Sequence, residues 1–327
     1  QSFNENLLKV AEQLKGTNTK QFGPIYKKKN FTQKRVLNLL LSDLHFQSLL
    51  DPREVPFAYG SVEEARRLAA VVKATCEYKT QYRDNTVLNI HLLGDIIDGR
   101  LHDQSAGAPL AEQVAAALHL LTQAVQVLSM HYLHINIYTA VGNHGRNVAR
   151  HPNRAITQKW DAIETILYSS LKKSCQDLPN VQIEVGYKPW YDCKIFSNYG
   201  FFTHGDTVIQ PGSPSKSINI ANMRKQTNEI NATAKDGKSY SLFAVGHVHV
   251  PSQTYLPNGV VFVTNGALIS PDSYALSLGI MDAVCSQWLL ESVPERILGD
   301  SRLVTIGEKD DKNSELDQII RPFVSLC

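Results

Sequence analysis

Residues 36–45, "VLNLLLSDLH", determine the fold class because they join a buried strand to a polar strand end. Residues 36–41 are apolar except for Asn38, a composition typical of a strand that is covered on both faces of a sheet. Asp43 and His45 follow directly, where the strand ends. Strands covered on both faces occur mainly in parallel sheets flanked by helices, so this stretch predicts an α/β fold.

The same alternation of buried strand and amphipathic helix continues to about residue 175. The helix that starts at Ser61 carries Glu64 three residues later, a spacing that predicts a capping box at its first turn. The β-α-β-α-β-α order implies parallel strands with right-handed crossovers. The further strands are predicted at 86–95 and 133–144, and the helices at 61–81, 108–132 and 154–175.

The second half of the chain changes in style, because short strands separated by tight turns replace the alternating pattern. Only residues 213–234 interrupt these strands with a predicted helix. We therefore predict a two-sheet β-sandwich flanked by helices, in α-β-β-α layers. Three regions are expected: an N-terminal helix and basic linker at 1–35, the main domain at 36–292, and a C-terminal arm or tail at 293–327.

Composition limits the functional class. A formal charge of +2 over 327 residues is not that of a strongly charged tail or polyanion-coated protein. The five cysteines form no CxxC pair, which fits a reducing compartment and a cytoplasmic location. No apolar run approaches the ~20 residues that span a bilayer, so no membrane partner is expected. The oligomeric state stays open.

Asp, Asn or His residues stand directly after five of the predicted strands. Because the carboxyl ends of strands in an open α/β sheet face one crevice, these side chains are expected to converge. An imidazole-rich set of this kind is a usual way to hold a transition metal. The residues are Asp43, His45, Asp95, Asp98, Asn143, His144, His204, Asp206, His247 and His249.

The donor set indicates which metals fit. Carboxylate, amide and imidazole donors without thiolate suit Mn²⁺, Fe, Zn²⁺ or Ni²⁺, and we expect Mn²⁺. The donors exceed what one ion needs, so two divalent ions that share a bridging carboxylate are predicted. Two such ions, about 3.5–4 Å apart, lower the pKa of a bridging water and clamp the oxygens of an in-line displacement at phosphorus.

The ordered motifs DxH, GDxxD, GNH, H and GHxH, from about residue 36 to about residue 266, resemble those of the calcineurin-like metallophosphoesterase superfamily. The resemblance implies the two-sheet sandwich and a role for each motif position. His144 would contact the phosphate and donate a proton, and Asp95 would bridge the metals. The remaining ligands would be Asp43, His45 and His249 for the first metal, and Asn143, His204 and His247 for the second.

One position departs from the pattern of the superfamily. Many members continue GNH with an acidic residue, whereas this chain has Gly145. Either Asp98 or Asp206 supplies the acidic partner of His144, or His144 only binds phosphate. Arg146, the next residue, is a candidate substrate-binding clamp for phosphate, with a plain surface arginine as the alternative.

The chain is therefore predicted to be a metal-dependent phosphoric ester hydrolase. The lysines and arginines of the linker and of residues 146–154 favour a phosphodiesterase or nuclease acting on DNA or RNA. A phosphatase acting on a phosphoprotein or a small phosphorylated metabolite is the alternative, because the same metals serve both reactions. A non-catalytic binding protein on the same fold is a further alternative.

Overall fold

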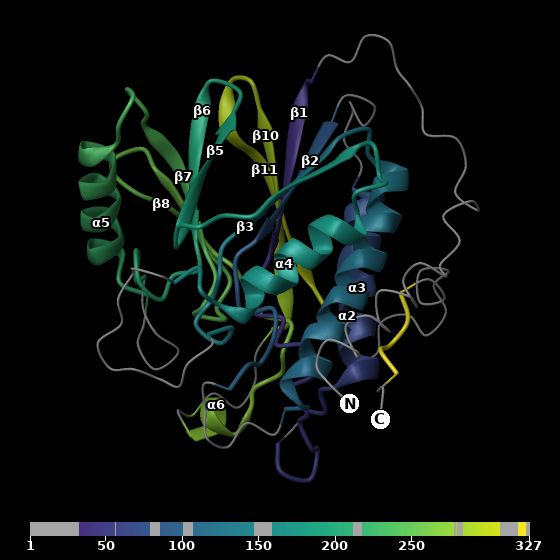
Figure 1. The fold of residues 1–327 in the computed structure, drawn as a ribbon. Coiled ribbons are helices and arrows are strands. Elements are labelled where there is room, and N and C mark those ends of the chain that lie inside the picture. The colour runs from purple at the N-terminus through teal and green to yellow at the C-terminus, as the bar shows by residue number, and fades with distance from the viewer. Residues whose placement is uncertain are drawn as a thin grey trace.

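A computed structural model gives the architecture of most of the chain, in which two β-sheets lie face to face (Figure 1). The predicted N-terminal helix, nearly all of the basic linker, and Arg150 and Arg154 lie outside the described residues. The described residues are 33–55, 57–78, 86–100, 107–146, 159–211, 218–277, 279, 284–307 and 320–324.

The first sheet contains the parallel strands that the sequence predicted. Its strand order is β11-β10-β1-β2-β3-β4, in which β1 to β4 run parallel and β10 is antiparallel to both of its neighbours, β1 and β11. Each strand of the parallel part therefore ends at the same edge. The strands are β1 (Arg35–Leu41), β2 (Thr86–Leu92), β3 (Ile135–Thr139), β4 (Val181–Glu184), β10 (Ser286–Val293) and β11 (Arg296–Thr305).

The second sheet has the order β5-β6-β7-β9-β8 and comes from the part of the chain with short strands. Its central strands β6, β7 and β9 are parallel, so β6 and β7 also end at one edge. The strands are β5 (Trp190–Ile195), β6 (Asn198–Thr203), β7 (Tyr240–Val245), β8 (Ser252–Tyr255) and β9 (Val261–Thr264).

Part of the predicted C-terminal arm, residues 296–305, belongs to the first sheet. These residues form β11, which pairs antiparallel with β10 as the edge of the first sheet. Most of its side chains are exposed or half-buried, because an edge strand has little of the sandwich to pack against. Its polar composition therefore resembled that of a tail.

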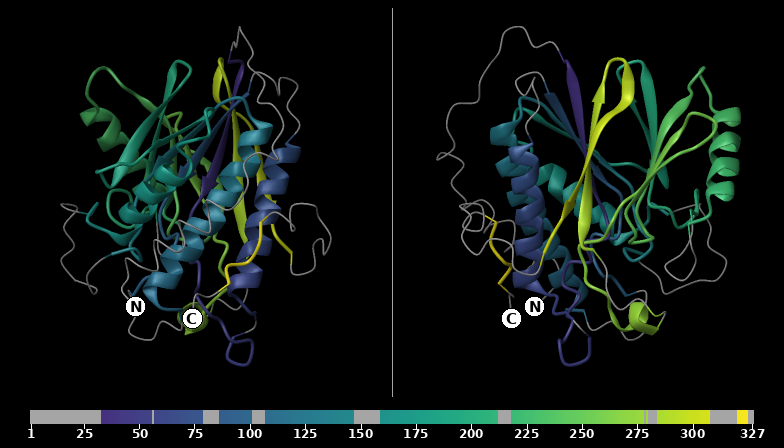
Figure 2. Two further views of the ribbon diagram at one scale, coloured as in Figure 1. Left: turned by 45° about the vertical axis from the view of Figure 1, so that its right-hand side comes forward. Right: turned by 180° about the vertical axis from the view of Figure 1, so that it is seen from behind.

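Helices cover both outer faces of the sandwich, which confirms the predicted α-β-β-α layers (Figure 2). Apolar side chains of α2 (Ser61–Glu77), α3 (Leu110–His131) and α4 (Ile163–Ser174) pack with those of the first sheet in one core. Helix α5 (Ile220–Thr233) packs on the second sheet through Met223, and α6 (Ser273–Ser277) is short. By length and hydropathy α3 could cross a membrane, but 78% of its apolar window is buried inside the protein.

A third core fills the space between the sheets, and it contains the buried histidine His91 of β2. The His91 ring stacks on Phe202 with centroids 3.9 Å apart. Its nitrogens lie 3.0 Å from the Tyr191 hydroxyl and 3.1 Å from Asn38 Oδ1. Burial lowers the pKa of His91 to about 3. The imidazole is therefore neutral in the folded protein at neutral pH.

We predict that His91 makes the protein acid-sensitive. Its folded pKa lies below the unfolded value of 6.5, so its contribution is present above pH 6.5 and is lost as the pH falls. From pH 7 to pH 5 this loss is about 2 kcal/mol. Urea unfolding of His91→Phe should show a pH dependence smaller by that amount, although the variant is less stable at both pH values. His134→Gln, at an exposed position, should behave as wild type. An unchanged pH dependence in His91→Phe would contradict this reading.

Candidate metal centre

The predicted site residues lie together at the carboxyl ends of strands from both sheets. Three groups of side chains have ligand atoms within 4.8 Å of one another. Asn143 joins them through a contact with His204. The groups are Asp43, His45 and His249; His45, Asp95 and His144; and Asp95, His204 and His247.

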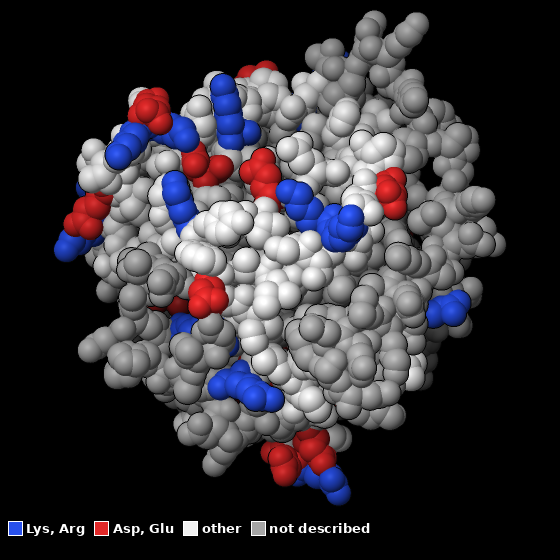
Figure 3. Space-filling view, in the orientation of Figure 1, with Lys and Arg blue, Asp and Glu red and all other residues white. Residues whose placement is uncertain are grey.

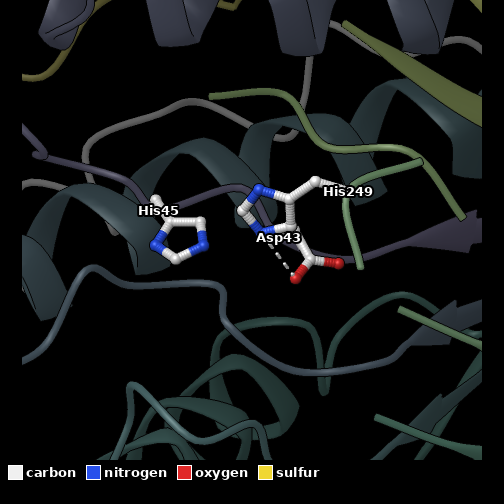
Figure 4. Close-up of side chains that lie close together, drawn as sticks. All are labelled: Asp43, His45 and His249. Carbon is white, nitrogen blue, oxygen red and sulfur yellow. Dashed lines mark ion pairs between the residues drawn. The ribbon is translucent and has the colours of Figure 1, made fainter. Parts of the chain in front are cut away.

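The first group combines the end of β1 with the segment after β7 (Figure 4). His249 Nε2 lies 3.2 Å from Asp43 Oδ1, and the His45 ring lies beside that of His249, with centroids 5.4 Å apart. The backbone N–H of His247 donates to both carboxylate oxygens of Asp43, at 3.1 and 3.0 Å. Two distant segments of the chain are thus joined at one carboxylate.

The second group centres on Asp95, which follows β2. Asp95 Oδ2 and Asn143 Oδ1 each lie 3.0 Å from His204 Nε2. The His144 backbone N–H donates to Asp95 Oδ1 at 2.8 Å, and the His247 ring lies 5.1 Å from that of His204. Asp95 also shares a group with His45, so it lies between the two sets of donors.

The backbone at these residues is unusual. Asp43, His45, Asp95, His247 and His249 have φ values of 55°, 46°, 52°, 69° and 58°. Non-glycine residues in this left-handed region cost of order 1–3 kcal/mol each and persist only where the surroundings fix them. Here the strand ends bond to one another, as when the His45 N–H donates to Asp95 O at 3.0 Å.

The glycine of GNH is explained by close approach. A Cβ on Gly142 would lie 1.9 Å from Asp95 Oδ1, so no larger residue fits there without movement. Gly142 therefore allows the segment after β3 to reach the Asp95 carboxylate.

Burial shapes the charges of the site. It lowers the pKa of His204, but the Asp95 and Asp43 carboxylates outweigh it and raise that pKa to about 10. Burial likewise opposes, and the Asp98, Asp95 and Asp43 carboxylates raise, the pKa of His45 to about 9. Burial and His204 lower the pKa of His247 to about 4. The neighbouring histidines hold the Asp95 pKa well below its usual value against burial. The buried carboxylates thus raise the affinity of this site for positive charge, either protons on the histidines or a cation.

A divalent metal fits this donor set. His45 Nε2 is buried and has no hydrogen-bond partner among the described residues, so an ion that displaces its proton could bind there. The surrounding donors are carboxylate oxygens, an amide oxygen and imidazole nitrogens, which suit a transition ion. An ion would also supply the positive charge that the buried carboxylates require.

His144 has its partner in the segment that contains Asp98, one of the two acidic candidates. Its Nδ1 lies 2.7 Å from the Asp98 carbonyl oxygen and 3.9 Å from the carboxylate Oδ1. Asp98 Oδ1 also lies 3.4 Å from His45 Nδ1. Burial lowers the pKa of His144. The backbone carbonyl therefore orients the His144 ring.

Asp206, the other candidate, binds two cations instead. Arg146 Nη2 donates to Asp206 Oδ2 at 3.3 Å, and Lys159 forms an ion pair with Oδ1. Arg146 is thus not a plain surface arginine, and its buried Nη1 has no hydrogen-bond partner among the described residues. Lys159 was not among the predicted site residues, because nothing in the local sequence links it to Asp206.

The predicted capping box at Ser61 is wrong. The N-cap residue of α2 is Gly60, and no side chain caps the helix. The Glu64 carboxylate instead accepts the Gln47 backbone N–H at 2.7 Å and the Gln47 side-chain amide at 2.6 Å. Burial raises the pKa of Glu64 to about 7. Glu64 therefore holds the segment that follows Asp43 and His45.

Comparisons with known proteins give only distant similarities. Neither a family model nor a curated protein matches the sequence. Among solved structures, a predicted phosphoesterase from Streptococcus pneumoniae has a TM-score of 0.34 at 12% identity, covering 84% of this chain and 100% of its own. Vps29 from Entamoeba histolytica, complexed with zinc, has a TM-score of 0.37 at 11% identity, covering 83% and 98%. A dimetal phosphatase from Danio rerio has a TM-score of 0.36 at 12% identity, covering 83% and 98%.

These TM-scores and identities are too low to indicate a function, so the chemistry of the site has to follow from its own geometry. The ends of β1, β2, β3, β6 and β7 lie together in the sandwich. The Asp, Asn and His side chains that follow these strands, one motif to each strand, therefore contact one another.

Proposed function

We propose that the chain is a two-metal phosphoesterase. Asp43, His45 and His249 would hold one divalent ion, and Asn143, His204 and His247 the other. The observation that carries this proposal is Asp95, a buried carboxylate that belongs to donor groups on both sides. We expect Mn²⁺ at both positions, because a mixed oxygen and imidazole set is poorly suited to Mg²⁺.

The reaction divides between the ions and the chain. When bound, two divalent ions polarise a phosphoryl group and activate water at neutral pH. The chain orients the substrate and moves a proton: His144, whose Nδ1–H donates to the Asp98 carbonyl, would contact the phosphate through Nε2 and, as the imidazolium, deliver the Nε2 proton to the leaving oxygen. Arg146 would bind a phosphate oxygen through Nη1 while the Asp206 carboxylate holds Nη2 of the same guanidinium group.

We further propose that the substrate is a nucleic-acid phosphodiester. An aromatic pair supports this choice: the Trp160 and Tyr187 rings lie 5.6 Å apart and are 42% and 69% exposed. Trp160 directly follows Lys159, whose ammonium pairs with Asp206, two residues beyond His204. Exposed aromatic rings beside a phosphate site suit the stacking of bases.

The distribution of surface charge gives less support to a nucleic-acid substrate. On the face shown in Figure 3, the described lysines and arginines are interspersed with acidic residues. No stripe of one sign crosses the described part of that face, in contrast to proteins that bind long duplexes. The exposed Trp160 and Tyr187 rings favour a single-stranded substrate, whose bases are free to stack.

The function is tested with four substrates: labelled single-stranded DNA, labelled RNA, bis(p-nitrophenyl) phosphate and p-nitrophenyl phosphate. We predict that Mn²⁺ supports cleavage of the diesters, that EDTA abolishes it, and that Mg²⁺ restores it less well. Asp95→Asn should be nearly inactive, because it removes the shared ligand charge.

Other outcomes point to other functions. Hydrolysis of the monoester alone would indicate a phosphatase. Full activity in excess chelator would contradict the two-metal site. No hydrolysis together with no stoichiometric Mn²⁺ would indicate a non-catalytic binding protein.

The role of His144 is tested by the leaving group. If His144 donates a proton, His144→Ala should slow cleavage of a dinucleotide by roughly 10²–10⁴-fold. The loss should be much smaller for a nitrophenyl diester, because p-nitrophenolate departs without protonation. Mn²⁺ content should stay at the wild-type value. An equal loss on both substrates would leave His144 as a phosphate contact only.

A further inference from the structure

Glu164, on the first turn of α4, lies at the junction of two ligand-bearing segments and is fully buried. Its Oε1 accepts the Ile96 backbone N–H at 2.6 Å, and its Oε2 accepts the Gly142 backbone N–H at 2.7 Å. Ile96 directly follows Asp95, and Gly142 directly precedes Asn143. One carboxylate therefore ties the segment after β2 to the segment after β3.

The space that Glu164 occupies is available because residue 145 is glycine. A Cβ on Gly145 would lie 2.4 Å from Glu164 Cγ and 2.7 Å from Cδ. The backbone also joins the two segments here, since the Ile163 N–H donates to Gly145 O at 2.7 Å. The start of α4 is thus fixed against the GNH segment with its carboxylate beside Gly145.

We propose that Glu164 is the positioning carboxylate of the metal centre, brought by a separate helix to the space beside Gly145, the position at which many superfamily members carry an acid. Glu164 acts through Ile96 and Gly142, which set the separation of Asp95 and Asn143. This inference rests on the proposed function, because the residues that it positions are the proposed metal ligands.

The chemistry of the side chain makes the proposal specific. Both carboxylate oxygens are used as acceptors, one for each segment. Glutamine has the same size but only one acceptor oxygen, so its NH₂ group would face a backbone N–H. Glu164→Gln therefore keeps the packing and breaks one of the two ties.

The test measures Mn²⁺ affinity and stoichiometry by titration calorimetry, with the melting temperature of the metal-free protein measured alongside. We expect Glu164→Gln to weaken binding of at least one Mn²⁺ by roughly 10–100-fold, the range for residues that orient metal ligands. Glu291→Gln is the matched control: Glu291 is a nearly buried carboxylate that binds Arg35 at the opposite end of the first sheet. This variant should keep wild-type affinity whatever its melting temperature.

Variants at residue 145 test whether Mn²⁺ affinity depends on a carboxylate in this space. Gly145→Ala should weaken Mn²⁺ binding in the wild type, because the new Cβ collides with Glu164. The same change should have little effect once Glu164→Ala has removed that side chain. Gly145→Asp combined with Glu164→Ala should recover part of the affinity, since it returns a carboxylate to the same space and Gly145 does not need a positive φ.

The outcomes separate the two proposals. Two Mn²⁺ ions bound by Glu164→Gln with wild-type affinity would overturn the positioning role and leave the proposed function intact. Affinity losses that follow the melting temperature in every variant, including Glu291→Gln, would reduce Glu164 to a structural residue. Absence of Mn²⁺ binding by the wild-type protein would overturn both.

Discussion

A carboxylate that is removed from water must be neutralised or paired, and two such carboxylates, Asp43 and Asp95, lie at the centre of this protein. Their partners among the described residues are the imidazoles of His249 and His204 and backbone N–H groups. Strand ends from both sheets must meet to supply these partners. The sandwich can therefore be understood as the scaffold that surrounds two buried negative charges with nitrogen donors.

The cost of this arrangement is concentrated in the backbone of the site. Left-handed residues occur at Asp43, His45 and Asp95, after strands of the first sheet, and at His247 and His249, after β7 of the second. Hydrogen bonds between the strand ends hold these residues in place. Further hydrogen bonds join the same segments to the buried carboxylates of Glu64 and Glu164, in the first turns of α2 and α4. Because the donors are fixed before anything binds, a metal or a substrate would pay little to organise them.

Local pattern predicted the parallel strands well and predicted that the polar residues after each strand lie together, because strand periodicity and the residues after each strand are both written in consecutive residues. Contacts between distant segments were not predictable in the same way. Glu164 meets Ile96 across 68 residues, and Lys159 meets Asp206 across 47. Glu64 shows the competition directly: a local rule assigned it to a helix cap, but the tertiary contact with Gln47 took precedence. Strand β11 was missed because its few buried apolar residues, Leu298 and Val304, stand among exposed charged and polar ones.

The central claim is that two divalent ions share Asp95. Crystals grown with Mn²⁺ and measured near the manganese absorption edge would test it most directly. We expect two anomalous peaks about 3.5–4 Å apart, on either side of the Asp95 carboxylate. One should lie among Asp43, His45 and His249, and the other beside Asn143, His204 and His247. A single peak away from Asp95, or none at saturating Mn²⁺, would contradict it.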